Sequence, residues 1–461
     1  WTPNPTGGFA DITQINEPAL ANTLTLANGV VTTVTINSSL PTNLFNLTVN
    51  DGGTSNLAFT NIGTVNGGTG VTNTLISGEA TSNVWTISSV NGGNYNDGQS
   101  LVFTQFGNLT GGGNTDNFVL AGGTLSGSID GGLGVNTLTG DNVANTWTVS
   151  AANAGTVTGV TGGFSNIQNL VGGSGNDSFV FSNAATLTGT VNGGAGGINV
   201  LDFSAYTTGV NVALSSASAT GYIGTTAGST NPTGGFSNIT QIKDGSGANT
   251  LSGENTANSW SITGVNSGTL NDSTAILTWS GFGSLTGGSG ADSFTLSGTG
   301  HISGLITGGG GVDTLTGNNL TNAWTISGAN AGTLTDANGS NVFSAITNLV
   351  GGTGSDTLTG VVAGSSWSIT GAKAVTVSGM NGSSMDALVG GTGVDTFTLA
   401  SGILTFNGSI AGGGGVDTLA ATDGSNAWSI TGANAGSLNT TTTFSAITNL
   451  VGGTGSDTLT G

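Results

Sequence analysis

Hydrophobic and polar positions alternate along short segments of this chain. Large apolar and small polar residues follow one another in Thr314-Leu315-Thr316, Trp324-Thr325-Ile326 and Phe343-Ser344-Ala345-Ile346. A period of two is the pattern of a half-buried β-strand. Clusters of Gly, Asn and Asp separate these segments and supply the positive φ angles that tight corners need. Because the strong helix formers Glu, Lys, Arg and Gln are nearly absent, the pattern predicts an all-β protein.

A turn sequence, Gly-Gly-x-Gly-x-(Asp/Asn), recurs along the chain. Its regular copies begin at Gly131, Gly172, Gly287, Gly308, Gly351, Gly390, Gly412 and Gly452. Looser copies begin at Gly67, Gly111, Gly193 and Asp244. Nearly every separation is about 21 residues or twice that, which suits one coil of a parallel β-solenoid and is too short for paired-helix repeats. The prediction is an elongated parallel β-solenoid, of the β-helix or β-roll kind, of roughly 22 coils and on the order of 100 Å in length.

Residues 1–461 are therefore expected to form one continuous solenoid region. An irregular insertion is expected at about 200–240, where the regular spacing of the turns is interrupted. Within it, 201–206 and 209–214 predict two strands joined by a turn. The segment 231–242 nearly duplicates 4–15, and 452–461 copies 351–360. The chain thus starts and stops within repeats. We expect the solenoid to continue along its axis, by head-to-tail stacking of copies or as part of a longer repeat chain.

A second pattern places a tryptophan in the strand that follows some of the turns. The clearest copies are Asn322-Ala323-Trp324-Thr325-Ile326 and Asn426-Ala427-Trp428-Ser429-Ile430, and related copies carry Trp85, Trp147, Trp260 and Trp367. Sugar stacking is one interpretation of these tryptophans. The favoured one is that they fill the core, because each holds a fixed place in an apolar strand. The Asn two positions before each clear Trp is interpreted as a turn or ladder residue.

The amino-acid composition excludes several classes of function. The chain carries 22 acidic residues, two Lys, no Arg, one His and no Cys, for a net charge of −20. Nucleic acid is excluded as a partner because phosphate binding needs clustered bases. Membrane insertion is not expected because no apolar run approaches the 18 residues of a spanning helix. Disulfides and thiolate metal sites are impossible. This acidic, base-poor composition favours a secreted surface protein.

The turns carry a resemblance. Gly172-Gly173-Ser174-Gly175-Asn176-Asp177-Ser178-Phe179-Val180 is similar to the nonapeptide of RTX (haemolysin-type) proteins. RTX repeats run in tandem and share calcium, whereas here the nonapeptide stands alone or in pairs one coil apart. The whole organisation more closely resembles the β-solenoid repeats of giant bacterial adhesins and filamentous surface proteins. The resemblance implies a bacterial, extracellular location at the cell surface.

Calcium is the metal that the turns suggest, because it prefers carboxylate and carbonyl oxygens. Stacked coils would place Asp292 over Asp313 and Asp395 over Asp417, and a cation would relieve the repulsion between each pair. Weaker candidates are Asp177, Asp356 and Asp457. The competing interpretation is an Asx turn in which the charge is incidental. Asn136 and Asn249, at the same motif position, favour that alternative.

No enzyme is expected, since the chain lacks an Arg and its Glu residues, Glu17, Glu79 and Glu254, stand singly in turns with a solvated role. His301 has no partner for a metal site. Ice binding by Thr-x-Thr arrays is disfavoured because the copies are two or more coils apart. The sequence thus predicts a non-catalytic extracellular fibre, filament or adhesin stalk. The alternative is a calcium-dependent RTX-type β-roll module of a larger secreted effector or adhesin.

Overall fold

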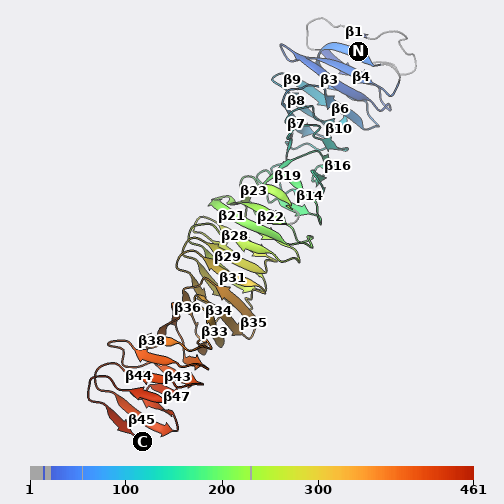
Figure 1. Cartoon of the computed structure of the whole chain (residues 1–461). Coiled ribbons are helices and arrows are strands. Elements are labelled where there is room, and N and C mark those ends of the chain that lie inside the picture. The colour runs from blue at the N-terminus through green and yellow to red at the C-terminus, as the bar shows by residue number, and fades with distance from the viewer. Residues whose placement is uncertain (1–13, 16–21, 54–55, 229–230) are drawn as a thin grey trace. The chain divides into compact units, whose positions relative to one another are not determined.

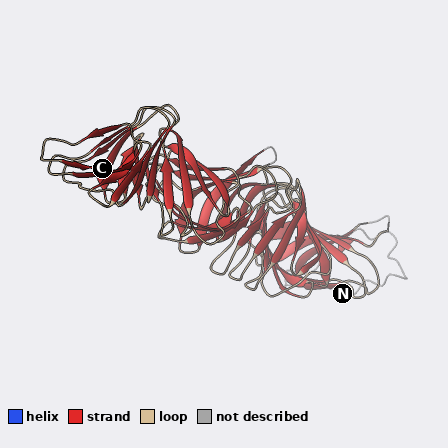
Figure 2. Cartoon of the chain, turned by 90° about the horizontal axis from the view of Figure 1, so that it is seen from below, coloured by secondary structure: helices blue, strands red, loops and turns tan. Residues whose placement is uncertain are grey.

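A computed structural model describes residues 14–15, 22–53, 56–228 and 231–461. All regular structure in these residues is β-strand, and no helix occurs among them (Figure 2). The described chain divides into two compact units. Unit 1 consists of Trp1–Val210 and Ser216–Gly247, and unit 2 of Asn211–Ser215 and Ala248–Gly461. The prediction of an all-β chain is confirmed.

Within each unit the strands stack above one another in two hydrogen-bonded ladders (Figure 1). In unit 1 the first ladder consists, in stacking order, of β4 (Leu44–Asn50), β3 (Thr33–Leu40), β6 (Asn73–Ser77), β10 (Phe106–Thr110), β12 (Ile129–Asp130), β16 (Val160–Ser165), β15 (Ala154–Val157), β14 (Thr146–Ala151), β18 (Ser178–Phe181), β20 (Val200–Asp202) and β24 (Gln241–Lys243). The second consists of β5 (Leu57–Asn66), β9 (Ser100–Thr104), β8 (Gly92–Asn96), β7 (Asn83–Ser89), β11 (Asp116–Leu120), β13 (Thr137–Thr139), β17 (Asn169–Val171), β19 (Leu187–Asn192), β23 (Thr233–Ile239) and β22 (Gly221–Gly228). Two short strands, β1 (Gln14–Ile15) and β2 (Asn22–Thr25), lie beside β5. Strand β4 also pairs with β5 in antiparallel fashion, so the two ladders of unit 1 are joined there.

Unit 2 repeats this arrangement. Its first ladder consists of β28 (Ile276–Ser280), β27 (Ser267–Asn271), β26 (Ser259–Gly264), β30 (Ser293–Leu296), β32 (Thr314–Thr316), β36 (Asn348–Val350), β40 (Met380–Ser383), β39 (Ala374–Val377), β38 (Ser366–Gly371), β42 (Thr396–Leu399), β44 (Thr418–Ala420) and β48 (Asn449–Val451). The second consists of β21 (Val210–Ser218), β25 (Thr250–Ser252), β29 (Ser284–Gly288), β31 (Leu305–Gly309), β35 (Gly339–Ser344), β34 (Ala331–Asp336), β33 (Asn322–Gly328), β37 (Asp356–Thr359), β41 (Ala387–Gly391), β43 (Gly408–Gly413), β47 (Thr442–Ser445), β46 (Ala435–Leu438), β45 (Ala427–Gly432) and β49 (Thr458–Thr460).

Successive parts of the chain alternate between the two ladders. We call each strand of a ladder a rung, and most neighbouring rungs are parallel, as a solenoid requires. Like residues stack on like: Phe294 pairs with Leu315, which pairs with Leu349. These side chains are buried, and the residues on either side of them in each strand are more exposed. The two ladders meet across this core, where a methyl group on Gly382 would touch Leu358 of the opposite ladder.

Three-stranded antiparallel meanders interrupt the parallel stacking, an arrangement that the sequence pattern did not predict. In unit 2, β33 runs back through β34 to β35, with Trp324 opposite Leu334. The following rung, β37, then pairs in parallel with β33. Six meanders begin with a strand that carries a tryptophan, and these tryptophans are Trp85, Trp147, Trp260, Trp324, Trp367 and Trp428.

All six tryptophans lie in the core, so the prediction that they fill it is confirmed. Trp85, Trp147, Trp260 and Trp367 stack face to face on a phenylalanine of the next rung; Trp260, for example, lies 5.6 Å from Phe294 between ring centroids. Offset stacking of this kind adds to the gain from burial. The interval 200–240 contains β20 to β23, of which β21 has nine residues and β22 has eight.

Candidate functional site: the stacked Asx turns

The repeated turn is shaped by an Asp or Asn that folds back over its first glycine. In the copy at 308–313, a Cβ on Gly308 would lie less than 3.0 Å from both Asp313 Oδ2 and the carbonyl oxygen of Ala345. The next residue, Gly309, has a φ of 91°, which side chains other than glycine rarely adopt. The two glycines are therefore needed for different reasons, the first for space and the second for backbone conformation.

Side-chain oxygens tie each turn to its neighbour. The backbone N–H of Asp292 donates to Asp313 Oδ1 at 2.8 Å, and that of Asp395 donates to Asp417 Oδ1 at 2.8 Å. Asp292 Oδ1 in turn accepts from the backbone of Asn258 at 2.7 Å. The predicted stacking of Asp292 with Asp313 and of Asp395 with Asp417 is thus confirmed, with an N–H group between the two carboxyls of each pair.

The asparagines two positions before the tryptophans belong to the same ladder. Asn258 Nδ2 donates to the carbonyl of Gly287 at 3.0 Å and to Asp292 Oδ1 at 2.8 Å. Asn322 Nδ2 reaches the carbonyl of Gly351 at 2.8 Å in the same way. Their interpretation as ladder residues is confirmed.

A second set of turns has a looser sequence, and only its residues Asn322 and Asn426 were interpreted as turn or ladder residues from the sequence. Asn145, Asn258, Asn322, Ser365 and Asn426 each close a turn that begins about nine residues after a Gly-rich turn, a spacing typical of tandem nonapeptides. Spacing from one Asx residue to the next, rather than the double glycine, was the signal that would have found them.

The other carboxylate oxygen of most of these aspartates is buried without a hydrogen-bond partner. This is true of Oδ2 in Asp177, Asp292, Asp313, Asp356, Asp395 and Asp417, whose residues are all at most 1% exposed. Burial raises the pKa of Asp292, while hydrogen bonds from Asn258 oppose the shift. Burial likewise raises the pKa of Asp177, Asp313, Asp356 and Asp395. Asp457 is exposed, and its Oδ1 accepts from the backbone of Asn426 at 3.0 Å.

The hydrogen bonds to Oδ1 weigh against calcium at that atom. Calcium takes six to eight oxygen ligands, but Oδ1 of each aspartate faces N–H donors, which repel a cation. Asp292 Oδ2 and the carbonyl oxygen of Gly308 both lie close to the Cβ position of Gly287. Among the described residues, no group of three or more His, Asp or Glu side chains is placed to hold a metal.

The remaining Glu, His and Lys residues have different surroundings in the described part of the chain. Glu254 is buried, which corrects the expectation of a solvated role, and burial raises its pKa. Glu79 is half-buried, and Glu17 lies outside the described residues. The His301 ring packs on the backbone of Gly339. Both lysines form ion pairs, Lys243 with Asp202 at 3.3 Å and Lys373 with Asp386.

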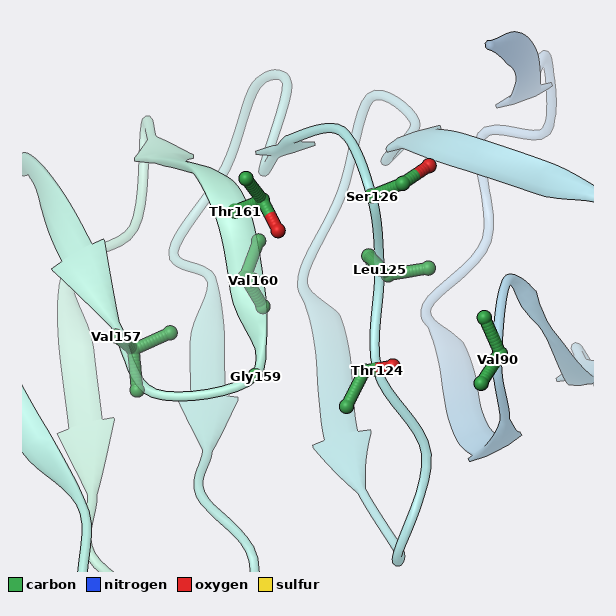
Figure 3. Close-up of a pocket in the computed structure, with 8 residues that line it drawn as sticks. All are labelled: Val90, Thr124, Leu125, Ser126, Val157, Gly159, Val160 and Thr161. Carbon is green, nitrogen blue, oxygen red and sulfur yellow. The ribbon is translucent and has the colours of Figure 1, made fainter. Parts of the chain in front are cut away.

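A shallow hollow of about 400 Å³ lies on unit 1 between successive turns (Figure 3). Its lining is aliphatic and hydroxylic, with Val90, Thr124, Leu125, Val160 and Thr161 among the residues that form it. None of its lining residues titrates near neutral pH. The hollow therefore presents aliphatic surface and hydroxyl groups.

No protein-family model and no curated protein matches the chain. Within the described residues there is no helix that is long and apolar enough to cross a bilayer.

Proposed function

We propose that this chain is a non-catalytic structural segment of an extracellular bacterial fibre, filament or adhesin stalk, built from solenoid coils of about 21 residues. The observation that carries the proposal is the continuous bonding between rungs. Asp292 and Asp313 are joined over 21 positions, and Asp395 and Asp417 over 22. Longer separations occur where a meander is inserted, as between Leu315 and Leu349.

Stiffness follows from this bonding. Each rung is held by the backbone ladder, by the side chains of the Asx turns and by the stacked core, so bending must strain all three at once. A protein whose function is length and surface display needs this property and needs no active site. The acidic, base-poor composition of the sequence supports a secreted location at the bacterial cell surface.

The repetition of like rungs suits a fibre, because each coil needs only its neighbours for its contacts. We propose that further coils extend the stack, either from the same polypeptide or from a second copy stacked head to tail. Sedimentation over a range of concentrations tests the second case, which requires growing oligomers.

Small-angle X-ray scattering tests the elongated shape. A compact domain of 461 residues has a radius of gyration of about 23 Å. A rod on the order of 100 Å long gives a larger radius and a skewed distance distribution. A radius near the compact value would contradict the proposal. The alternative, a calcium-dependent RTX-type module, requires that a chelator unfold the chain, and the N–H donors around the carboxyls weigh against it.

A further inference from the structure

Four Phe-Ser-x-Ile segments within the described residues share one local geometry and can be compared directly. In each, a strand ends in Phe-Ser-x-Ile, and residue x adopts a left-handed conformation with φ between 52° and 56°. The carbonyl of residue x points at the Asx turn of the preceding coil. The four x residues are Asn166, Asn238, Ala345 and Ala446, and the facing Asx residues are Asn136, Asn199, Asp313 and Asp417.

We call each contact between residue x and its facing Asx residue a joint. In two joints the Asx residue is an asparagine, and both the nitrogen and the oxygen of its side-chain amide are hydrogen-bonded. Asn136 Nδ2 donates to the carbonyl of Asn166 at 3.0 Å, and Asn199 Nδ2 donates to that of Asn238 at 3.1 Å. In both, Oδ1 accepts a backbone N–H from the rung before, as from Asp116 to Asn136 at 2.9 Å. The amide thus uses its donor on one side and its acceptor on the other.

In the other two joints a carboxyl takes the place of the amide. Asp313 Oδ1 accepts the backbone N–H of Asp292, just as the asparagine oxygen does. A Cβ on Gly308 would lie less than 3.0 Å from both Asp313 Oδ2 and the carbonyl oxygen of Ala345. A Cβ on Gly131 would meet Asn136 Nδ2 and the Asn166 carbonyl in the same manner. Oδ2 of Asp313 therefore occupies the position of the amide nitrogen, where it faces an acceptor.

We propose that Asp313 is held in its neutral form, with a proton on Oδ2 that it donates to the carbonyl of Ala345, so that the carboxyl reproduces the asparagine of the equivalent joints. Two acceptor oxygens that face each other without a hydrogen between them repel each other, and a buried oxygen without a partner destabilises the fold. A proton on Oδ2 removes both penalties. Asp417 has the same arrangement against Ala446.

The surroundings of Asp313 are consistent with a neutral carboxyl. Burial raises its pKa, against one opposing hydrogen bond from Asp292. Asp292 is also the titratable group that faces it across the rung, and the repulsion between the two carboxyls when both are ionised adds to the raised pKa of Asp292. From the following coil, Thr347 and Asn348 present uncharged N–H groups to the backbone carbonyl of Asp313. This turn is thus more stable at low pH. The hydrogen bond from protonated Asp313 to the Ala345 carbonyl exists below the raised pKa and is lost as pH rises through it.

The test compares Asp313→Asn with the full-length parent at two pH values. The substitution is expected to raise the melting temperature at pH 8, where the parent carboxyl is forced towards ionisation, and to leave it unchanged at pH 4. The reciprocal variant Asn136→Asp places a carboxyl in the equivalent joint. It is expected to lower the melting temperature at pH 8 and to recover at pH 4.

Infrared difference spectra supply a readout that does not depend on stability. At pH 6 the parent is expected to show the C=O band of a protonated carboxyl that Asp313→Asn lacks. Loss of stability at pH 8 in Asp313→Asn, or stabilisation of the parent but not of the variant by calcium chloride, would show that the ionised form is the functional one and overturn the proposal. Identical infrared spectra of the two proteins would overturn it as well.

Discussion

At the scale of single residues, the turns depend on glycines that leave room for a carboxyl. A Cβ on Gly287 would lie less than 3.0 Å from Asp292 Oδ2 and from the carbonyl of Gly308. We expect Gly287→Ala to lower the free energy of unfolding by roughly 2–4 kcal/mol, because the backbone oxygen cannot move aside. Gly328→Ala is the matched control, since nothing lies within 4 Å of its Cβ position. Equal urea midpoints for the two variants would refute this explanation.

Asp244 offers a second single-residue prediction. Burial raises its pKa to about 7, while the backbone N–H of Gly245 donates to Oδ1 at 2.7 Å. A raised carboxyl pKa contributes stability that is present below about pH 4 and is lost as pH rises towards 7. Asp244→Asn should therefore stabilise the protein by roughly 2–4 kcal/mol at pH 8 and have little effect at pH 4. Thermal unfolding at both pH values measures this, and an equal shift at each would contradict it.

Part of the candidate site could be predicted from the sequence, and part could not. Stacking of Asp292 with Asp313 followed from their spacing, because rungs in register align equivalent residues. The spacing did not predict which group each carboxylate oxygen of these aspartates contacts. Whether Oδ1 meets an N–H or a cation depends on how far the neighbouring backbone is offset, and spacing contains no information about that offset.

At the scale of elements, the meanders explain why coil lengths vary. Their first hairpins turn in two residues, as at Ala329 and Asn330, where Asn330 has a φ of 55°. Asparagine tolerates this left-handed conformation, which favours a tight hairpin. The period-two pattern predicted the strands but not their direction, since parallel and antiparallel strands alternate in the same way. The recurring segment Gly328-Ala329-Asn330-Ala331-Gly332 was the hairpin signal.

The tryptophan of each meander anchors it to the core. Trp324 is fully buried and packs edge to face on Phe343 at 6.1 Å between ring centroids. We expect Trp324→Ala to cost about 3–5 kcal/mol, because a large cavity opens between the ladders. Val362→Ala, at a side chain that is 74% exposed, should change stability by less than about 0.5 kcal/mol. Denaturant unfolding of both variants checks the contrast, and a small loss for Trp324→Ala would place the tryptophan outside the cooperative core.

At the scale of the whole molecule, the donor groups around the carboxyls predict indifference to divalent cations. Adding a chelator should leave the β-sheet circular dichroism and the melting temperature of the intact chain unchanged, and adding calcium should not raise them. The parent in buffer containing magnesium alone controls for ionic strength. A loss of β structure on chelation would instead favour the calcium-dependent module.

The central claim is that the strands stack as rungs along the axis of a fibre. Diffraction from aligned, hydrated protein tests it most directly, because the spacing between rungs lies along that axis. The account predicts a reflection at about 4.7–4.8 Å parallel to the long axis of the particles. A reflection of this spacing perpendicular to the long axis, or compact particles that do not align, would contradict it.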